Sequence, residues 1–247
     1  TSGNYLDMVH TDYSAMGWKT YNHPKTTMTI CVSEVGKKAF TMQFPKAPTE
    51  VIHNLINLPD KIEKQQLTKN RDDDLVLISA TRLSWEKGYS RMKEMAKRMN
   101  KLKKHFIWYV FTNDVPDEDI PNFIFMKPTY DVNNYVASAD YYVVLSNTEC
   151  CSMSNGSALG MGIPIISTNY PSIYEQGFIN EKTGYILEMD LSNLDNVIQQ
   201  MFDNIPKYKP ILPDNKSAWN KWLGKETISN YEFNGEEIIE DIQDRWI

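Results

Sequence analysis

The chain has 247 residues, of which 41% are hydrophobic and 23% charged, and its formal net charge at pH 7 is −6. This composition is typical of a globular protein of one large domain, or of one domain with part of another, and the acidic balance argues against a general nucleic-acid binder. No apolar run is long enough to predict a membrane-spanning helix. The four histidines have no metal-ligand spacing, and three cysteines, two of them adjacent, favour a reducing compartment over a disulfide framework.

The first 58 residues differ from the rest of the chain. Strand-like runs occur at residues 5–10, 28–32 and 51–55. The chain begins with Thr1 instead of methionine, and we expect it to be a fragment of something longer. We therefore expect residues 1–58 to be the remnant of a preceding domain followed by a crossing segment.

Apolar runs alternate with helical patterns from residue 75 to residue 202. Strands are expected at 75–80, 106–111, 122–126, 141–145, 163–167 and 184–187, and helices from about 88 to 102 and at 132–138, 154–161 and 191–202. The first of these helices has an apolar stripe at residues 89, 92, 95, 99 and 102. This repeated β-α order predicts an α/β fold with a doubly wound parallel sheet, in a domain that we place at residues 59–225.

The C-terminal part of the chain continues this domain and then changes character. Residues 204–214 contain three prolines and predict a connector. Ile238, Ile239, Ile242 and Trp246 recur at helical spacing in an acidic segment. We expect residues 226–247 to form a terminal helix that packs back on the body.

Ligands of doubly wound sheets bind at the carboxyl ends of the strands, and this rule predicts that two loops of the chain face a ligand. The first is Thr81-Arg-Leu-Ser-Trp-Glu-Lys-Gly88. Arg82 offers a planar fork of donors and Lys87 a mobile point charge, and two such cations suit a diphosphate. Gly88 allows a tight turn into the following helix. The alternative is an ordinary exposed loop with solvated charges.

The second loop, residues 146–156, is polar and small and leads into a helix. Ser152 or Ser154 can cap that helix, whose free N–H groups and positive dipole end would face a phosphate. Glu149 is an acceptor for sugar hydroxyls. The alternative is a plain capped helix after a strand, and Cys150 and Cys151 are interpreted as small packing residues, since no histidine lies near them in sequence.

Together the two loops resemble the glycosyltransferases of family 4, which are retaining enzymes of the GT-B fold. The family motif "gRL-x-x-EKG" corresponds to residues 81–88. The family motif "S-x-x-E-G" corresponds to Ser146-Asn-Thr-Glu149 and the residue after it. The motif that follows, "EA-x-x-x-G-x-P-(V/I)-I", corresponds to Ser157-Ala-Leu-Gly-Met-Gly-Ile-Pro-Ile-Ile166. Shorter matches occur at residues 30–33, 51–54 and 139–140. Residues 191–195 look similar to bacterial cell-surface polysaccharide transferases.

The resemblance implies roles for individual residues. Arg82 and Lys87 would bind the donor diphosphate and stabilise it as the leaving group, and Glu149 would contact the donor sugar. His10 resembles the histidine of a first-domain segment that lies beside the donor sugar. The remaining substrate-binding candidates are Ser84, then Met126, Lys127 and Tyr130 around the base, the backbone N–H groups of Cys150, Cys151, Ser152, Met153 and Ser154, and Ser157.

The chain departs from the family pattern at Ser157. A glutamate that grips the ribose hydroxyls is usual there, and a serine offers only neutral hydrogen bonds. Losing the charged partner costs about 1.5–3 kcal/mol, or roughly 10–150-fold in affinity. A second departure is the short first domain, which in the family supplies much of the acceptor site.

The resemblance implies a hexosyltransferase-type enzyme that moves a sugar from a nucleoside diphosphate sugar, with UDP as the expected nucleotide, to an acceptor hydroxyl with retention. The acceptor would be a carbohydrate or a lipid-linked molecule in cell-surface polysaccharide synthesis. We expect no metal or other cofactor, no nucleic-acid partner, and a cytoplasmic protein with peripheral association at the inner face of the membrane. One alternative is a catalytically impaired nucleotide-sugar-binding module. Another Rossmann-like enzyme, such as a dehydrogenase, is disfavoured because no Gly-x-Gly-x-x-Gly motif opens a helix.

Overall fold

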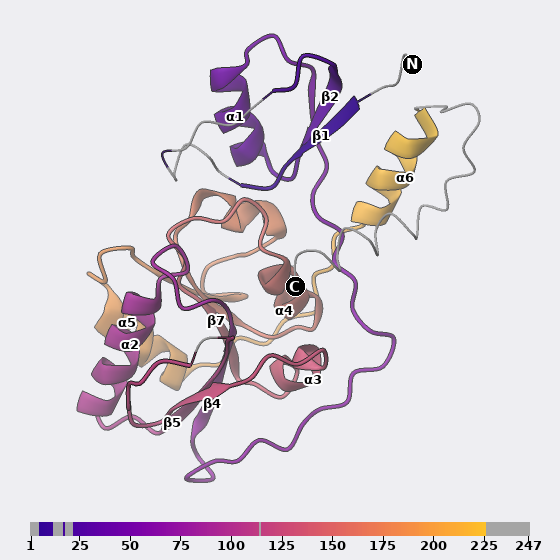
Figure 1. Ribbon diagram of the computed structural model, residues 1–247. Coiled ribbons are helices and arrows are strands. Elements are labelled where there is room, and N and C mark those ends of the chain that lie inside the picture. The colour runs from indigo at the N-terminus through magenta and orange to yellow at the C-terminus, as the bar shows by residue number, and fades with distance from the viewer. Residues whose placement is uncertain (1–4, 12–16, 18–21, 114, 226–247) are drawn as a thin grey trace.

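The computed structural model describes residues 5–11, 17, 22–113 and 115–225, and within them it contains two parallel sheets (Figure 1). The helix expected within residues 226–247 lies outside the described residues. No helix in the described ranges is both long and apolar enough to cross a lipid bilayer.

The smaller sheet is N-terminal and has the strand order β1-β2-β3. It consists of β1 (Tyr5–Val9), β2 (Thr26–Cys31) and β3 (Thr49–Val51), all parallel, with α1 (Glu34–Gln43) connecting β2 to β3. The expectation for residues 51–55 was wrong in detail. The strand there is β3, which ends at Val51 and pairs with β2, so it belongs to the N-terminal sheet.

The larger sheet contains all six strands expected between residues 75 and 187. They are β4 (Leu75–Ala80), β5 (Phe106–Phe111), β6 (Phe123–Met126), β7 (Tyr141–Val144), β8 (Ile165–Thr168) and β9 (Gly184–Leu187). All pairings are parallel, in the order β6-β5-β4-β7-β8-β9. The domain limits at residues 58/59 and 225/226 remain predictions.

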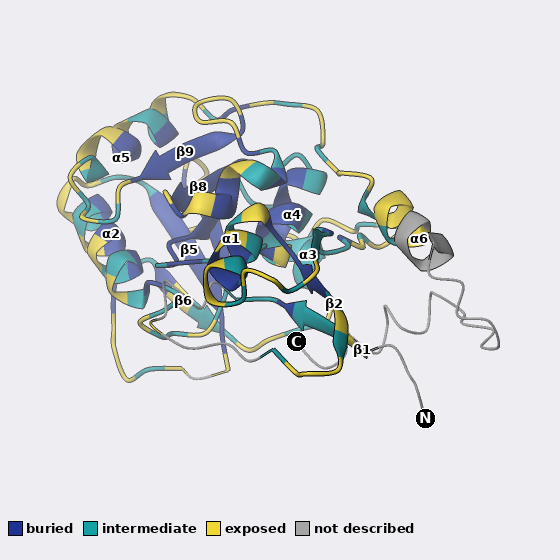
Figure 2. Ribbon diagram, turned by 90° about the horizontal axis from the view of Figure 1, so that it is seen from above, coloured by how far each residue is buried: buried dark blue, intermediate teal, exposed yellow. Residues whose placement is uncertain are grey.

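Helices cover both faces of the larger sheet, and all of its strands except the edge strand β6 are largely buried between them (Figure 2). One face packs against α2 (Tyr89–Lys101) and α5 (Leu194–Asp203), and the other against α3 (Val132–Val136), α4 (Met153–Gly160) and the 3-10 helix η1 (Pro171–Gln176). Leu77 faces the first group, whereas Val76 and Ile78 face the second, as the alternation of side chains along a strand requires. The expected doubly wound sheet is therefore confirmed.

Two α-helices of the described residues were not expected from the sequence, nor was the 3-10 helix η1. In α1, Ser33 caps the first turn by accepting a hydrogen bond from the Gly36 amide at 3.0 Å. The other is α6 (Asn215–Lys225), which follows the proline-rich connector. Trp219 of α6 donates its indole N–H to the His53 carbonyl at 3.1 Å, so this helix contacts the segment that links the two sheets.

The strand order reverses direction at the centre of the larger sheet. From β4 the chain proceeds through β5 to β6 on one side, and from β7 through β8 to β9 on the other. Ligands of α/β sheets bind at such a topological switch point, beside the loops that follow the two central strands. The loops after β4 and β7 are the two that the sequence singled out.

Candidate nucleotide-sugar site

The loop after β4 lies directly against the loop after β7. Gly88 has a φ of +71°, and a Cβ added to it would lie 1.7 Å from the Leu145 carbonyl oxygen. Asn147 ties the loops together: its backbone amide donates to the Glu86 carbonyl at 2.8 Å, and its side-chain amide donates to the Trp85 carbonyl at 2.8 Å. The two loops thus form one continuous surface at the switch point.

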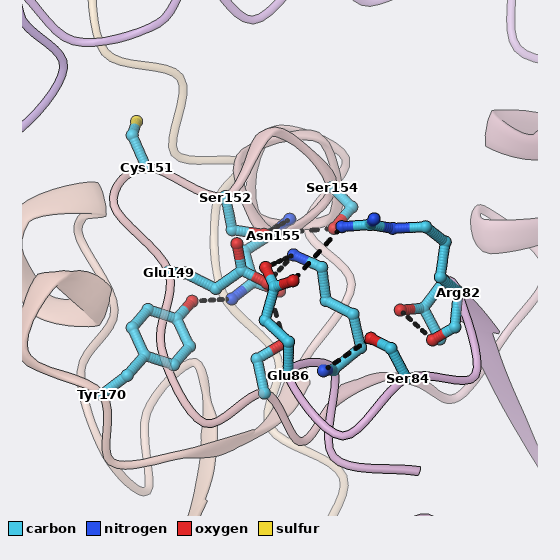
Figure 3. A network of polar contacts seen from close by, with 12 residues as sticks. Arg82, Ser84, Glu86, Glu149, Cys151, Ser152, Ser154, Asn155 and Tyr170 are labelled. Carbon is cyan, nitrogen blue, oxygen red and sulfur yellow. Dashed lines mark hydrogen bonds and ion pairs between the residues drawn. The ribbon is translucent and has the colours of Figure 1, made fainter. Parts of the chain in front are cut away.

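Four charged side chains meet on this surface (Figure 3). Lys87 Nζ lies 2.8 Å from Glu149 Oε1 and 3.6 Å from Glu86 Oε1, and Arg82 Nη2 lies 3.4 Å from Glu86 Oε2. The Arg82 side chain is 68% exposed, whereas those of Lys87 and Glu149 are 20% and 14% exposed. Arg82 is therefore the cation most accessible to an incoming anion.

Two serine hydroxyls, in addition to Lys87, hold Glu149 in position. Ser146 donates its hydroxyl to Glu149 Oε1 at 2.7 Å, and Ser172 of η1 donates to the Glu149 backbone carbonyl at 2.6 Å. These bonds fix the residue between the end of β7 and the start of α4. Its orientation is thus set before any ligand arrives.

The N-terminus of α4 lies beside these charges. Of the two expected capping residues, Ser152 is the N-cap, and its hydroxyl accepts from the Asn155 amide at 3.4 Å and lies 3.2 Å from the Ser154 hydroxyl. The helix begins at Met153, so its positive dipole end points toward the loop. Asn155 is fully buried and donates its side-chain amide to the Tyr170 hydroxyl.

The two adjacent cysteines contact protein groups through their side chains. Cys150 is buried, with its Sγ 3.0 Å from the Ser33 hydroxyl at the start of α1. Cys151 Sγ lies 3.7 Å from the Gln176 side-chain amide and points away from the carboxylates in Figure 3. Burial raises the pKa of the Cys151 thiol to about 11. A binding role for either residue thus rests on its backbone N–H group.

The other expected site residues lie at varied distances from this cluster. Ser84 belongs to it, since its hydroxyl accepts from the Lys87 amide at 3.3 Å, and Ser157 is half-buried one turn beyond Ser154 on α4. Met126 ends β6, which is separated from β4 by one strand, and Lys127 and Tyr130 are exposed in the loop that follows.

His10 directly follows β1, in the smaller sheet. Burial lowers its pKa below the ordinary histidine value.

Several residues at the site were not singled out from the sequence. Asn147 and Ser146 lie inside the second motif, but nothing in a single sequence says which loop they bond. Glu175 of η1 accepts the backbone N–H groups of Glu34 and Val35 at 2.7 and 3.2 Å, so it binds the N-terminus of α1 across the two sheets. No local pattern could have identified that contact, because 140 residues separate Glu175 from Val35.

The side chains at the site show no clustering of the kind that holds a metal ion. Among the described residues, no group of three or more His, Cys, Asp or Glu side chains could do so.

Comparison with known proteins identifies the family. Residues 60–209, more than half of the chain, match the model for glycosyl transferases group 1. The chain belongs to this family. The match includes both loops of the site. Among curated proteins, none matches the chain significantly by sequence.

Solved structures share the fold. WaaG, a glycosyltransferase involved in lipopolysaccharide biosynthesis, is 17% identical with a TM-score of 0.64, over 93% of this chain and 66% of WaaG. Anabaena HepE, in complex with UDP-glucose, is 14% identical with a TM-score of 0.61, over 88% of this chain and 68% of HepE. A TarM variant of S. aureus, in complex with UDP among other ligands, is 14% identical with a TM-score of 0.63, over 98% of this chain and 50% of TarM.

These likenesses confirm the expected fold class, which is the Rossmann-like half of a GT-B glycosyltransferase with part of a preceding domain. The chain spans about half the length of the GtfA/B and TarM structures that it matches. At identities of 12–17%, these structures share the fold of this chain but do not identify its substrates.

Proposed function

We propose that this protein transfers a hexosyl group from a UDP-sugar to an acceptor hydroxyl with retention, as a member of glycosyltransferase family 4. The observation that carries the proposal is the meeting of Arg82, Lys87, Glu149 and the N-terminus of α4 at the switch point. Two cations and a helix N-terminus suit a diphosphate, and a carboxylate suits sugar hydroxyls. The UDP complexes of HepE and TarM support the choice of nucleotide.

The chemistry we propose is mainly electrostatic. As the bond to the sugar breaks, negative charge grows on the diphosphate, and Arg82, Lys87 and the α4 amides stabilise it. At about 4 Å and an effective dielectric constant near 20, each ion pair contributes roughly 4 kcal/mol before desolvation costs. The departing phosphate would take the proton from the acceptor hydroxyl on the same face of the sugar, which preserves the anomeric configuration.

The remaining residues are assigned supporting roles in this proposal. Glu149 and His10 would contact the donor sugar, and the α4 N-terminus would hold the phosphate through backbone amides. The base would lie near Met126, Lys127 and Tyr130, beyond the end of β6. We propose that the cations make a metal or other cofactor unnecessary for charge stabilisation.

We also propose a cellular context. The acceptor would be a carbohydrate or a lipid-linked molecule used in cell-surface polysaccharide synthesis, which the fold shared with WaaG supports. Lipid-linked acceptors are reached at a membrane surface. We therefore propose a cytoplasmic protein that associates peripherally with the inner face of the membrane and binds no nucleic acid.

Arg82→Ala and Lys87→Ala test the central assignment. Each variant should lower the rate of UDP-sugar hydrolysis or transfer by roughly 10-fold or more, because each removes one stabilising charge from the leaving group. Lys97→Ala is the matched control, since Lys97 forms an exposed ion pair with Glu94 within α2. Rates at the level of the unsubstituted protein in both site variants would refute the proposal.

A nucleotide-sugar-binding module without efficient turnover is the second candidate, and Ser157 favours it. Ser157 is half-buried on α4. It stands at the position where the family that the chain resembles has a ribose-binding glutamate. Calorimetry with UDP, GDP and ADP, combined with a transfer assay, separates the two functions. Nucleotide binding without turnover in the full-length protein would support the binding module over the enzyme.

A further inference from the structure

Glu86 lies between the two cations of the proposed diphosphate site. Its Oε2 is 3.4 Å from Arg82 Nη2, and its Oε1 is 3.6 Å from Lys87 Nζ. Its backbone carbonyl accepts the Asn147 amide at 2.8 Å, so the residue is anchored at this position. The side chain is 27% exposed, so rotation can release the carboxylate to water while the backbone stays in place.

The charges on this surface cancel in the free protein. Arg82 and Lys87 contribute two positive charges, and Glu86 and Glu149 contribute two negative charges within ion-pair distance of them. A diphosphate carries at least two negative charges of its own, and like charges at close range disfavour binding. A diphosphate would therefore bind more tightly once one of the two carboxylates has withdrawn.

Of these two carboxylates, Glu86 is the one more able to leave. Glu149 is 14% exposed and has two partners at normal hydrogen-bond distance, Lys87 and Ser146. The contacts of Glu86 are longer, and its partner Arg82 is mostly exposed. Exposed ion pairs are individually weak, so a phosphate can replace the Glu86 carboxylate at little cost.

We propose that Glu86 is a resident counter-anion, whose carboxylate occupies the place of a donor phosphate in the free protein and is displaced when a diphosphate binds. The proposal rests on the diphosphate role assigned above to Arg82 and Lys87. Glu86 then sets the affinity of the site: it weakens binding of the diphosphate and speeds its release as product. It keeps the two cations neutralised between turnovers.

Glu86→Gln tests this, because it removes the charge and keeps the shape of the side chain. Isothermal titration calorimetry at low salt, with UDP and separately with inorganic pyrophosphate, should show roughly three- to thirty-fold tighter binding to the variant, since two weak ion pairs no longer compete. The gain should shrink in an Arg82→Ala background. Glu118→Gln is the matched control, because it removes a Lys–Glu pair of 3.0 Å elsewhere, and it should leave both affinities unchanged.

The outcomes separate this inference from the proposed function. If the unsubstituted protein binds UDP and Glu86→Gln binds it equally or more weakly, the counter-anion role is wrong and the donor site stands. If pyrophosphate binding strengthens but no nucleotide sugar is bound or turned over, the counter-anion role stands and the proposed function fails. Absence of binding in every variant overturns both. If Glu86→Gln unfolds at a lower temperature than the unsubstituted protein, Glu86→Asp serves as the second variant. Its shorter side chain draws the carboxylate back from Arg82, so it should bind UDP and pyrophosphate more tightly than the unsubstituted protein.

Discussion

At the scale of single residues, short polar side chains hold the charged groups of the site in place. Arg82 and Lys87 both pair with Glu86, and Lys87 also pairs with Glu149. Ser146, Asn147 and Ser172 hold them in place through backbone and carboxylate contacts. Short polar side chains of this kind are common in loops, so residue type alone could not distinguish the ones that position the site.

Ser157 leads to a prediction of increased affinity. Ser157→Glu should tighten UDP binding by roughly 10–150-fold, because a carboxylate that accepts hydrogen bonds from the ribose contributes about 1.5–3 kcal/mol. The gain should appear in calorimetry with UDP and be absent with pyrophosphate, which lacks a ribose. Ser192→Glu is the control, since it adds the same charge at an exposed position outside the site. Equal gains with both ligands would contradict a ribose contact at residue 157.

At the scale of elements, the close packing of the β4–α2 turn against the end of β7 builds the site. The turn is left-handed at Gly88, and the glycine leaves room for the Leu145 carbonyl. α2 then begins at Tyr89, with Arg91 donating to the same carbonyl at 3.2 Å. Any side chain at residue 88 would separate the two loops and with them the cations from Glu149.

Gly88→Ala should therefore lower the free energy of unfolding by more than the strain of a left-handed backbone conformation accounts for. Gly162→Ala is the matched control, because Gly162 has a φ of +74° but its added Cβ would meet nothing closer than 3.5 Å. The control should cost about 1–2 kcal/mol from backbone strain alone. Gly88→Ala should cost about 1–3 kcal/mol more from overpacking, measured as the difference in free energy of unfolding by urea. Equal losses would show that the loops separate without penalty.

At the scale of the whole molecule, the smaller sheet is attached to the larger one through contacts at the site. Glu175 of η1 binds the first amides of α1, and Cys150 contacts Ser33 at the cap of the same helix. α1 lies near η1 in Figure 1, above the larger sheet. The loop that carries Glu149 is thus directly connected to the N-terminal sheet.

Glu175→Ala should loosen this connection. The lost carboxylate contributes about 0.3–1 kcal/mol at a helix N-terminus, so hydrogen exchange of the Glu34 and Val35 amides should accelerate by up to about fivefold. Glu188→Ala, which removes a carboxylate from an exposed residue, should leave these amides unchanged. Unchanged exchange in both variants would show that the carboxylate does not protect α1.

The sequence predicted the larger sheet well because its strands are continuous apolar runs, the pattern of parallel strands buried on both faces. It did not reveal α1 and α6. α1 buries only three residues, Gly36, Ala39 and Phe40, so its apolar stripe is short, and α6 follows a segment that reads as a connector. The third strand of the smaller sheet lies at residues 49–51 instead of 51–55, because an apolar run does not show where strand pairing begins and ends.

The chain's periodicity and motifs established an α/β sheet, the two ligand-facing loops and the charged residues that they carry. Strand order, the pairing of Glu86 with both cations, the choice of Ser152 as the cap and the contact of Glu175 with α1 depended on the folded chain. The physical reason is that a repeating pattern reports the environment of each residue along its own strand or helix. Which groups neutralise or position one another depends on segments brought together from far apart in the chain, as Gly88 and Leu145 are.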